Sequence, residues 1–182
     1  KFKVNPDMAI FGKSIGNGYP ISILVGKAKV MDYAQDTFIS STFWTERIGP
    51  TAALKTLEVM ENIRSWELIT DIGVKIREGW CNIFNQYKIN FSISGIPSLS
   101  SYNFEENDLE IQTYITQEML KKGFLASNRF YACISHTKEI QKIYFTALDE
   151  VMHSLCKMKF DKNQIINNLD GPVRQSGFKR LN

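Results

Sequence analysis

Apolar residues near the start of the chain occur in short runs that turn residues separate. Ile10–Phe11 is one such run, and Pro20–Gly26 is a second, nearly continuous one. Runs of this kind are typical of strands that are buried on both faces in an α/β sheet. Further along, residues 30–35 predict a helical turn. Residues 37–43 are β-branched and aromatic, which predicts a third short strand or an extended loop.

A helical period follows. Gly49-Pro50 predicts a helix start, because proline is tolerated in the first turn, where its missing N–H costs no hydrogen bond. We expect a helix over residues 50–62, with one apolar side formed by Ala53, Leu54, Leu57 and Met60. Ser65 predicts the cap of a longer helix over residues 66–87. Gly73 and Gly79 should weaken that helix slightly. Its core stripe is predicted to be Ile69, Ile72, Ile76, Trp80 and Ile83.

The second half of the chain contains patterns typical of strands and patterns typical of helices. Residues 89–104 predict strands, and Asp108 predicts the cap of a helix over residues 109–122 that Gly123 ends. Residues 124–134 should be extended. Thr137 then predicts the cap of a helix that runs to about Met158, and the tail over residues 161–182 should be irregular. The inward positions of this last helix are predicted to be Ile140, Ile143, Ala147, Leu148, Val151 and Leu155.

This order of elements predicts an α/β fold class with two domains. It suits the end of a large, three-layer α/β domain followed by a small α+β domain. We place the first over residues 1–62, the second over residues 63–160 and a tail over residues 161–182.

The composition argues against a nucleic-acid-binding or membrane protein. The net charge of +3 comes from Lys and Arg spread among Asp and Glu, so we expect no nucleic-acid partner. The apolar runs are far shorter than a membrane span, and we expect no membrane association. Cys81, Cys133 and Cys156 are widely spaced. They indicate free or buried thiols in a reducing, cytoplasmic compartment, with neither a disulfide framework nor a metal site.

The chain opens on Lys1 and not on Met, within what reads as the middle of a loop–strand unit. We therefore expect a fragment that holds part of a site.

Lys13 is the principal candidate for chemistry, because it lies among glycines after an apolar run. Gly12-Lys13-Ser14 would fit a phosphate-binding P-loop, but that motif needs a glycine where this chain has Asp7. A dinucleotide fingerprint fails as well, since its third glycine would fall on Ile21.

Two interpretations of Lys13 remain from the residues alone. A partly desolvated lysine at a strand end loses its proton more easily and can attack a carbonyl, and neighbouring glycines let a bulky cofactor approach the backbone. The alternative is a solvated lysine on a glycine turn, which is the common state of lysines.

The wider stretch resembles the lysine region of class III pyridoxal-phosphate-dependent aminotransferases. The matching positions are Pro6, Asp7, Gly12, Lys13, Gly16, Gly18 and Pro20, followed by an apolar strand. The resemblance implies the fold type I of pyridoxal-phosphate transferases, with this chain as its carboxyl-terminal portion. It also implies pyridoxal 5'-phosphate as cofactor and Lys13 as the catalytic Schiff-base lysine.

A second matching stretch is Ser41-Thr42-Phe43. In the family, the second hydroxyl residue of this stretch binds the cofactor phosphate across a homodimer interface, which implies that role for Thr42 and a weaker one for Ser41. Alternatively, these residues could be present only because β-branched and aromatic residues favour extended structure. The following Trp44–Arg47 departs from the family, and we hypothesise that it shapes substrate access or the subunit contact.

Residues 123–140 resemble glutamate-1-semialdehyde aminomutases, with Tyr131 where that group carries a glutamate. Arg129 could bind a substrate carboxylate or be a surface arginine. We expect His136 to belong to the cap region of the last helix and to have no catalytic role.

The resemblance implies a transaminase that moves an amino group between a small amino donor and a keto or aldehyde acceptor. An aminomutase is the alternative. The aspartate that would partner the cofactor ring is missing, and Asp7 does not replace it, so we expect the chain alone to be inactive. The alternative to an enzyme is a non-catalytic module that serves in assembly.

Overall fold

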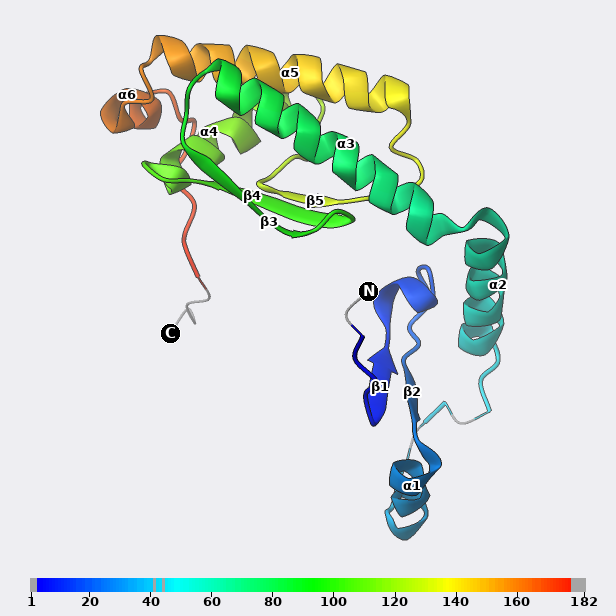
Figure 1. Ribbon diagram of the computed structural model, residues 1–182. Helices are drawn as coiled ribbons and strands as arrows, with labels where there is room; N and C mark the ends of the chain where they lie inside the picture. Colours follow the sequence, from blue (N-terminus) through cyan, green and yellow to red (C-terminus); the bar gives the residue numbers. More distant parts are fainter. Residues whose placement is uncertain (1–2, 41, 44, 178–182) are drawn as a thin grey trace. The chain divides into compact units, whose positions relative to one another are not determined.

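The chain divides into two units, residues 1–65 and 66–182. The computed structural model describes residues 3–40, 42–43 and 45–177. In the first unit, strands β1 (Met8–Phe11) and β2 (Ile23–Gly26) pair antiparallel, with Met8 opposite Gly26 and Phe11 opposite Ile23. Figure 1 shows the connection between them as a short helical turn, Lys13–Ile15.

Beyond the hairpin, the first unit is helical and irregular. A helix α1 (Ala28–Met31) continues into a 3-10 turn (Asp32–Asp36). Among the described positions of residues 37–43 there is no strand, so the alternative of a loop is confirmed there. Helix α2 (Ile48–Ile63) then ends at Arg64, which has a left-handed backbone with φ of 49°.

The hairpin strands are not buried on both faces, as their apolar runs predicted. Ile10 is 75% exposed, and Leu24 and Val25 are each 46% exposed. That prediction was wrong for this structure, because a two-stranded sheet has no neighbouring layer of its own to cover it.

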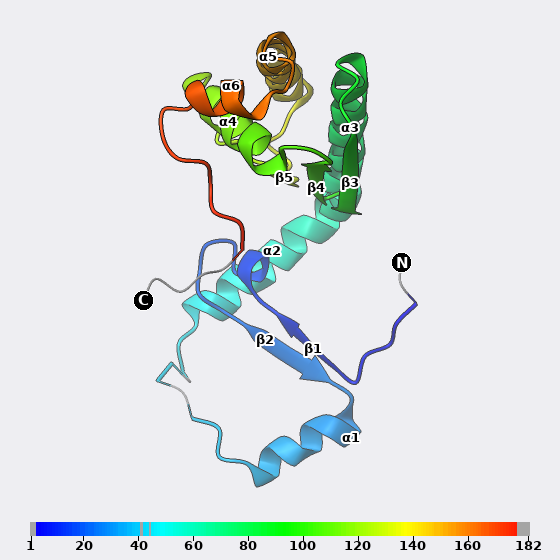
Figure 2. The same ribbon diagram turned by 90° about the vertical axis from the view of Figure 1, so that its left-hand side faces the viewer.

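The second unit holds the hydrophobic core. Its elements are α3 (Ser65–Gln86, of which Ser65 belongs to the first unit), β3 (Phe91–Ile96), β4 (Leu99–Phe104), α4 (Asp108–Lys121), β5 (Arg129–Tyr131), α5 (Lys138–Lys157) and α6 (Lys162–Asn167). The strands form an antiparallel sheet in the order β3-β4-β5. Helices α3, α4 and α5 lie on one side of this sheet (Figures 1 and 2).

The predicted core stripe of α3 is largely confirmed. Ile76, Trp80 and Ile83 are buried, and Ile72 packs against the same cluster. Gly73 and Gly79 are more than weak points of this helix. A Cβ at Gly73 would lie 1.9 Å from the Pro97 carbonyl oxygen, and one at Gly79 would lie 2.2 Å from the Phe145 ring. Both glycines therefore let neighbouring elements approach α3 closely.

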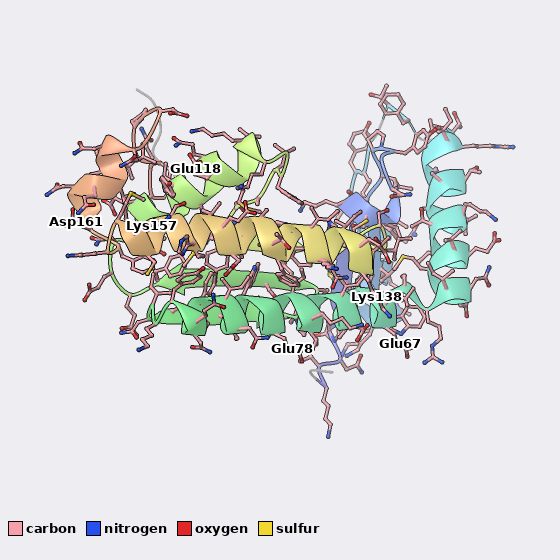
Figure 3. The ribbon with its side chains drawn as sticks, turned by 90° about the horizontal axis from the view of Figure 1, so that it is seen from above. Glu67, Glu78, Glu118, Lys138, Lys157 and Asp161 are labelled. Carbon is pink, nitrogen blue, oxygen red and sulfur yellow. The ribbon has the colours of Figure 1, made fainter. Side chains whose placement is uncertain are left out.

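Helix α5 confirms part of its predicted pattern. Ala147, Leu148, Val151 and Leu155 are buried. Ile140 and Ile143 are 42% and 59% exposed, so their predicted burial was wrong. Figure 3 shows that α3 and α5 start at the same end of the unit, where Glu67 and Lys138 lie, and run side by side.

Two predicted helix boundaries need correction. Asn107, with φ of 51°, is the N-cap of α4, and the Asp108 carboxylate instead accepts the Phe104 N–H at 2.8 Å. The predicted irregular tail contains α6, whose N-cap Asp161 accepts the Gln164 N–H at 2.9 Å. Thr137 caps α5 as predicted, since its side chain accepts the Ile140 N–H.

None of the helices in the described ranges has the length and apolar character needed to cross a membrane.

Candidate active site

Lys13 lies at the point where strand β1 ends. Gly12 extends the strand direction, and Lys13 starts the short helical turn with a left-handed backbone, φ 52°. Residues other than glycine adopt this conformation rarely, at a cost of about 1–3 kcal/mol, and such residues cluster at functional sites. The residue pattern did not predict that the lysine itself takes this conformation.

A series of tight turns holds the lysine loop. The amides of Gly16, Asn17 and Tyr19 donate to the carbonyls three residues earlier, at 3.1–3.2 Å. A Cβ at Gly16 would lie 2.1 Å from the Tyr19 carbonyl oxygen, so this turn requires glycine. Gly18 has φ of 110°, which also favours glycine. The glycine pattern after Lys13 thus has a local structural cause.

The motif residue Asp7 closes the base of the hairpin. Its carboxylate pairs with Lys27 Nζ at 2.7 Å, and its carbonyl accepts the Lys27 N–H at 3.0 Å. A Cβ at Gly26 would lie 2.8 Å from that same carbonyl oxygen. Asp7 therefore positions the two strands that carry the lysine loop.

The Lys13 side chain is available for chemistry. It is exposed, and its amine has no hydrogen bond or ion pair within the described parts of the chain. The desolvation that we expected for a catalytic lysine is not supplied by the described residues of this chain.

Thr42 lies in an exposed turn, and Ser41 lies outside the described residues. No hydrogen bond joins the side chains of Lys13 and Thr42, both of which are described. The role of the two hydroxyl residues stays a prediction.

Trp44 lies outside the described residues, but another residue of the departure over residues 44–47, Glu46, has a structural role. The Glu46 carboxylate accepts the backbone N–H of Ile48 and, at 3.1 Å, that of Gly49. A carboxylate at a helix N-terminus satisfies free amides and complements the helix dipole. Gly49 in turn has no Cβ to collide with Ile21, the nearest atom of which would be 3.3 Å away. Glu46 thus fixes the start of α2 beside the segment that follows the lysine loop. The signal for this cap was an acidic residue just before Gly49-Pro50.

A second group of polar side chains lies on the face of the β3-β4-β5 sheet opposite the helices. Arg129, Tyr131, Ser94 and Ser101 line a hollow of about 260 Å³ there, and the hydroxyls of Ser94 and Ser101 are 2.9 Å apart. The Arg129 guanidinium is exposed and has no ion pair among the described residues. Strand alternation, which turns Arg129 and Tyr131 outward while Phe130 packs inward, could have identified this pair.

Within the described residues, no group of three or more His, Cys, Asp or Glu side chains could hold a metal ion.

Comparison with known proteins identifies the family of the chain. The sequence model described as Aminotransferase class-III matches residues 1–150. The chain belongs to this family. The resemblance seen in the Lys13 stretch is therefore confirmed at the level of the family.

Curated relatives include both transaminases and aminomutases. The 3-aminobutyryl-CoA aminotransferase of Cloacimonas acidaminovorans is 30% identical over 86% of this chain and 40% of its own length. The glutamate-1-semialdehyde 2,1-aminomutase of Methanosphaera stadtmanae is 29% identical over 66% of this chain and 30% of its own length. The chain thus spans less than half the length of these relatives.

Solved structures establish the fold. The FumI protein of Sphingopyxis sp. MTA144 matches with a TM-score of 0.80 at 24% identity, over 86% of this chain and 39% of that one. The ornithine aminotransferase of Toxoplasma gondii matches with a TM-score of 0.76 at 19% identity, over 87% and 39%. The predicted α/β fold of pyridoxal-phosphate transferases, fold type I, is confirmed, and the family implies pyridoxal phosphate as cofactor.

The residues present fit that cofactor in part. An exposed amine without a partner, at Lys13, can bond to an aldehyde, and the Thr42 hydroxyl is a donor suited to a phosphate oxygen. The Asp7 carboxylate pairs with Lys27 at the base of the hairpin.

Proposed function

We propose that this chain supplies the cofactor lysine of an aminotransferase that moves an amino group between a small amino donor and a keto or aldehyde acceptor. The observation that carries the proposal is the Lys13 loop. It presents an exposed amine with a left-handed backbone, followed by turns that require glycine, in a chain of the class-III aminotransferase family.

Lys13 has two tasks in this proposal. Its amine binds the cofactor covalently, and bound pyridoxal phosphate supplies a ring that withdraws electrons from the substrate. In the reaction, the free Nζ of Lys13 would take a proton from the donor carbon and later return one, as general base and then acid.

Thr42, with Ser41 beside it, would donate hydroxyl hydrogen bonds to the cofactor phosphate of a partner subunit in a homodimer. The exposure of the Thr42 turn supports this part of the proposal, because the hydroxyl is open to a neighbouring molecule. We also propose a cytoplasmic location, since Cys81, Cys133 and Cys156 are all free thiols.

Arg129 would anchor the carboxylate of an acidic substrate. A guanidinium binds a carboxylate through two parallel hydrogen bonds, and the hydroxyls of Tyr131, Ser94 and Ser101 line the same hollow. Tyr131 stands where the aminomutase pattern has a glutamate, which favours a transaminase over an aminomutase.

The test uses the complete protein that contains this chain. It is incubated with pyridoxal phosphate, reduced with borohydride and digested, and the modified peptide is identified by mass spectrometry. We expect the adduct on Lys13 and its loss in Lys13→Ala. Lys27→Ala is the matched control, since Lys27 is an exposed lysine of the same hairpin that pairs with Asp7.

An adduct on another lysine would refute the assignment of Lys13. An adduct on Lys13 without turnover of any amino donor would favour the assembly module over the enzyme. Turnover of glutamate 1-semialdehyde without an external acceptor would identify the aminomutase.

A further inference from the structure

Immediately after strand β5, residues Cys133–His136 form a turn that is closed twice. The backbone N–H of His136 donates to the Cys133 carbonyl at 3.0 Å. In return, the Cys133 N–H donates to Nδ1 of the His136 ring, also at 3.0 Å. The imidazole therefore closes the turn by a side-chain bond that only an acceptor nitrogen can make.

The same histidine is tied to helix α5 and to strand β5. Its carbonyl accepts the Nε2–H of Gln141, a buried residue in the first turns of α5, at 2.8 Å. Its ring lies 4.9 Å from the ring of Phe130, the central residue of β5. Phe130 in turn packs edge-on against Trp80 of α3, at 6.3 Å. His136 thus joins the turn, the helix and the inward side of the strand.

Strand β5 is short and lies at the edge of the sheet, and just before it Asn128 exchanges hydrogen bonds with Tyr102 of β4. It pairs with β4 over residues 129–131, and the Ala132 N–H adds one bond to the Ser98 carbonyl at 2.9 Å. Arg129 precedes Phe130 and points to the opposite face. A shift or rotation of Phe130 would therefore move the base of the Arg129 side chain as well.

We propose that His136 is a positioning residue: by accepting the Cys133 N–H and packing on Phe130, it holds β5, and through it the Arg129 guanidinium, in place for an anionic group. The functional consequence rests on the proposed role of Arg129 in substrate binding. The positioning itself can be measured without any turnover.

The protonation state of His136 decides whether it can act in this way. A protonated ring would carry a hydrogen on Nδ1 and so oppose two donors, its own N–H and that of Cys133. Burial lowers the pKa of His136, which favours the neutral acceptor form. The ring also stands just before the N-terminus of α5, where a cation is disfavoured.

The titratable and charged groups that face the ring come from β5, α5 and the turn itself. His136 shares a hollow of about 460 Å³ with Arg129 and Tyr131 of β5 and Tyr144 of α5, while α3 and residues 123–127 contribute uncharged side chains. Burial raises the pKa of Tyr144 to about 12. Within the same turn Cys133 is a free thiol, and Lys138 and Glu139 start α5.

The chain contains two histidines, His136 and His153, which gives a matched pair of variants. His136→Asn keeps an acceptor oxygen near the position of Nδ1 but cannot be protonated. His153→Asn removes the other histidine, which is exposed on α5. The first measurement is hydrogen exchange of the Cys133 amide in the complete protein, between pH 7.5 and 4.5, corrected for intrinsic exchange, so that the range extends well below the ordinary histidine pKa.

We expect the corrected exchange rate of Cys133 to rise about fivefold to tenfold at low pH in the unmodified protein and in His153→Asn, because one hydrogen bond is lost. It should stay constant in His136→Asn. The second measurement is calorimetric binding of propane-1-sulfonate, an anion that stays ionised over this range. Its Kd should rise several-fold at low pH with the same dependence on His136, and binding should be lost in Arg129→Met.

A Cys133 amide whose exchange has no His136-dependent change would overturn the positioning role, as would pH-dependent sulfonate binding that persists in His136→Asn. These outcomes are separate from a failure of the proposed function. A missing adduct on Lys13 together with His136-dependent binding refutes the function and keeps the positioning role. An adduct on Lys13 with sulfonate binding that does not depend on His136 supports the proposed function and refutes the positioning role.

Discussion

The unit that carries Lys13 and the unit that carries Arg129 differ in how they use their apolar residues. In the second unit, side chains from α3, β4, α4 and α5 form one cluster, within which Trp80, Phe84 and Leu148 are fully buried. In the first unit, the buried residues of α2 are only Gly49 and Ala53, while Leu54 is 70% exposed. The hairpin strands are exposed as well.

The two units also differ in the contacts that hold them together. The second unit is held by side chains that are far apart in sequence, such as Trp80, whose Nε1–H donates to the Tyr144 hydroxyl at 2.8 Å. In the first unit, the described contacts are mainly tight turns, glycines without room for a Cβ, and the exposed ion pair between Asp7 and Lys27 at the base of the hairpin.

The largest expected effect tests the core of the second unit. Trp80→Ala removes a fully buried ring that contacts Tyr102 and Phe130, and should lower the free energy of unfolding by about 3–5 kcal/mol. Urea denaturation followed by far-UV circular dichroism measures this. Leu54→Ala in the first unit should cost less than about 1 kcal/mol, because that side chain is already exposed. Equal effects would contradict the contrast between the units.

Glycines provide the next comparison. Gly73→Ala would force a Cβ against the Pro97 carbonyl and should cost about 1–3 kcal/mol. Gly12→Ala should be tolerated, because its φ of −155° is ordinary extended backbone and its Cβ would meet only Ser22 Oγ, at 3.4 Å. Thermal unfolding of both variants checks the prediction, and a stable Gly73→Ala protein would show that the β3–β4 turn can move away from α3.

Helix caps should matter about equally in the two units. Thr137→Ala removes the side-chain acceptor for the Ile140 N–H and should cost about 1 kcal/mol in the second unit. Glu46→Ala removes the acceptor for Gly49 in the first and should cost a similar amount, part of it through the helix dipole. Hydrogen exchange at the first turns of α5 and α2 separates the two effects. Loss of protection far beyond the first turn would contradict a simple capping role.

The smallest effect concerns pH. The hydrogen bond from Lys162 lowers the pKa of the Glu110 carboxyl from its usual 4.5. The resulting stabilisation is present above pH 4.5 and is lost as the pH falls through the lowered pKa. Because Lys162 is 57% exposed, solvent limits the contribution to about 0.5–1 kcal/mol.

Lys162→Met should therefore reduce stability at pH 7 by that amount and weaken its fall at acid pH, as measured by urea denaturation across the range. Lys27→Met is the matched variant of the first unit, whose ion pair with Asp7 is exposed on both sides. It should change the free energy of unfolding by about 0.3 kcal/mol or less. A larger effect of Lys27→Met would show that the ion pair at the hairpin base contributes more to stability than its exposure indicates.

The sequence by itself determined the features that depend on neighbours along the chain. The motif around Lys13 pointed to the family, and within it Gly16 and Gly18 serve turns that lie within a few residues of the lysine. The stripe of Ile76, Trp80 and Ile83 predicted the core face of α3, and Thr137 predicted the start of α5. These features follow from helix period, turn geometry and capping, which are local properties.

Only the tertiary structure decided what depends on contacts between distant segments. It gave Gly73 and Gly79 a packing role, exposed Ile140 and Ile143 despite their helical spacing, and placed the His136 ring against Phe130. It also left the apolar runs of the first unit exposed. Periodicity shows that a segment has an apolar face, but burial requires a partner surface, and the sequence does not specify where that surface comes from.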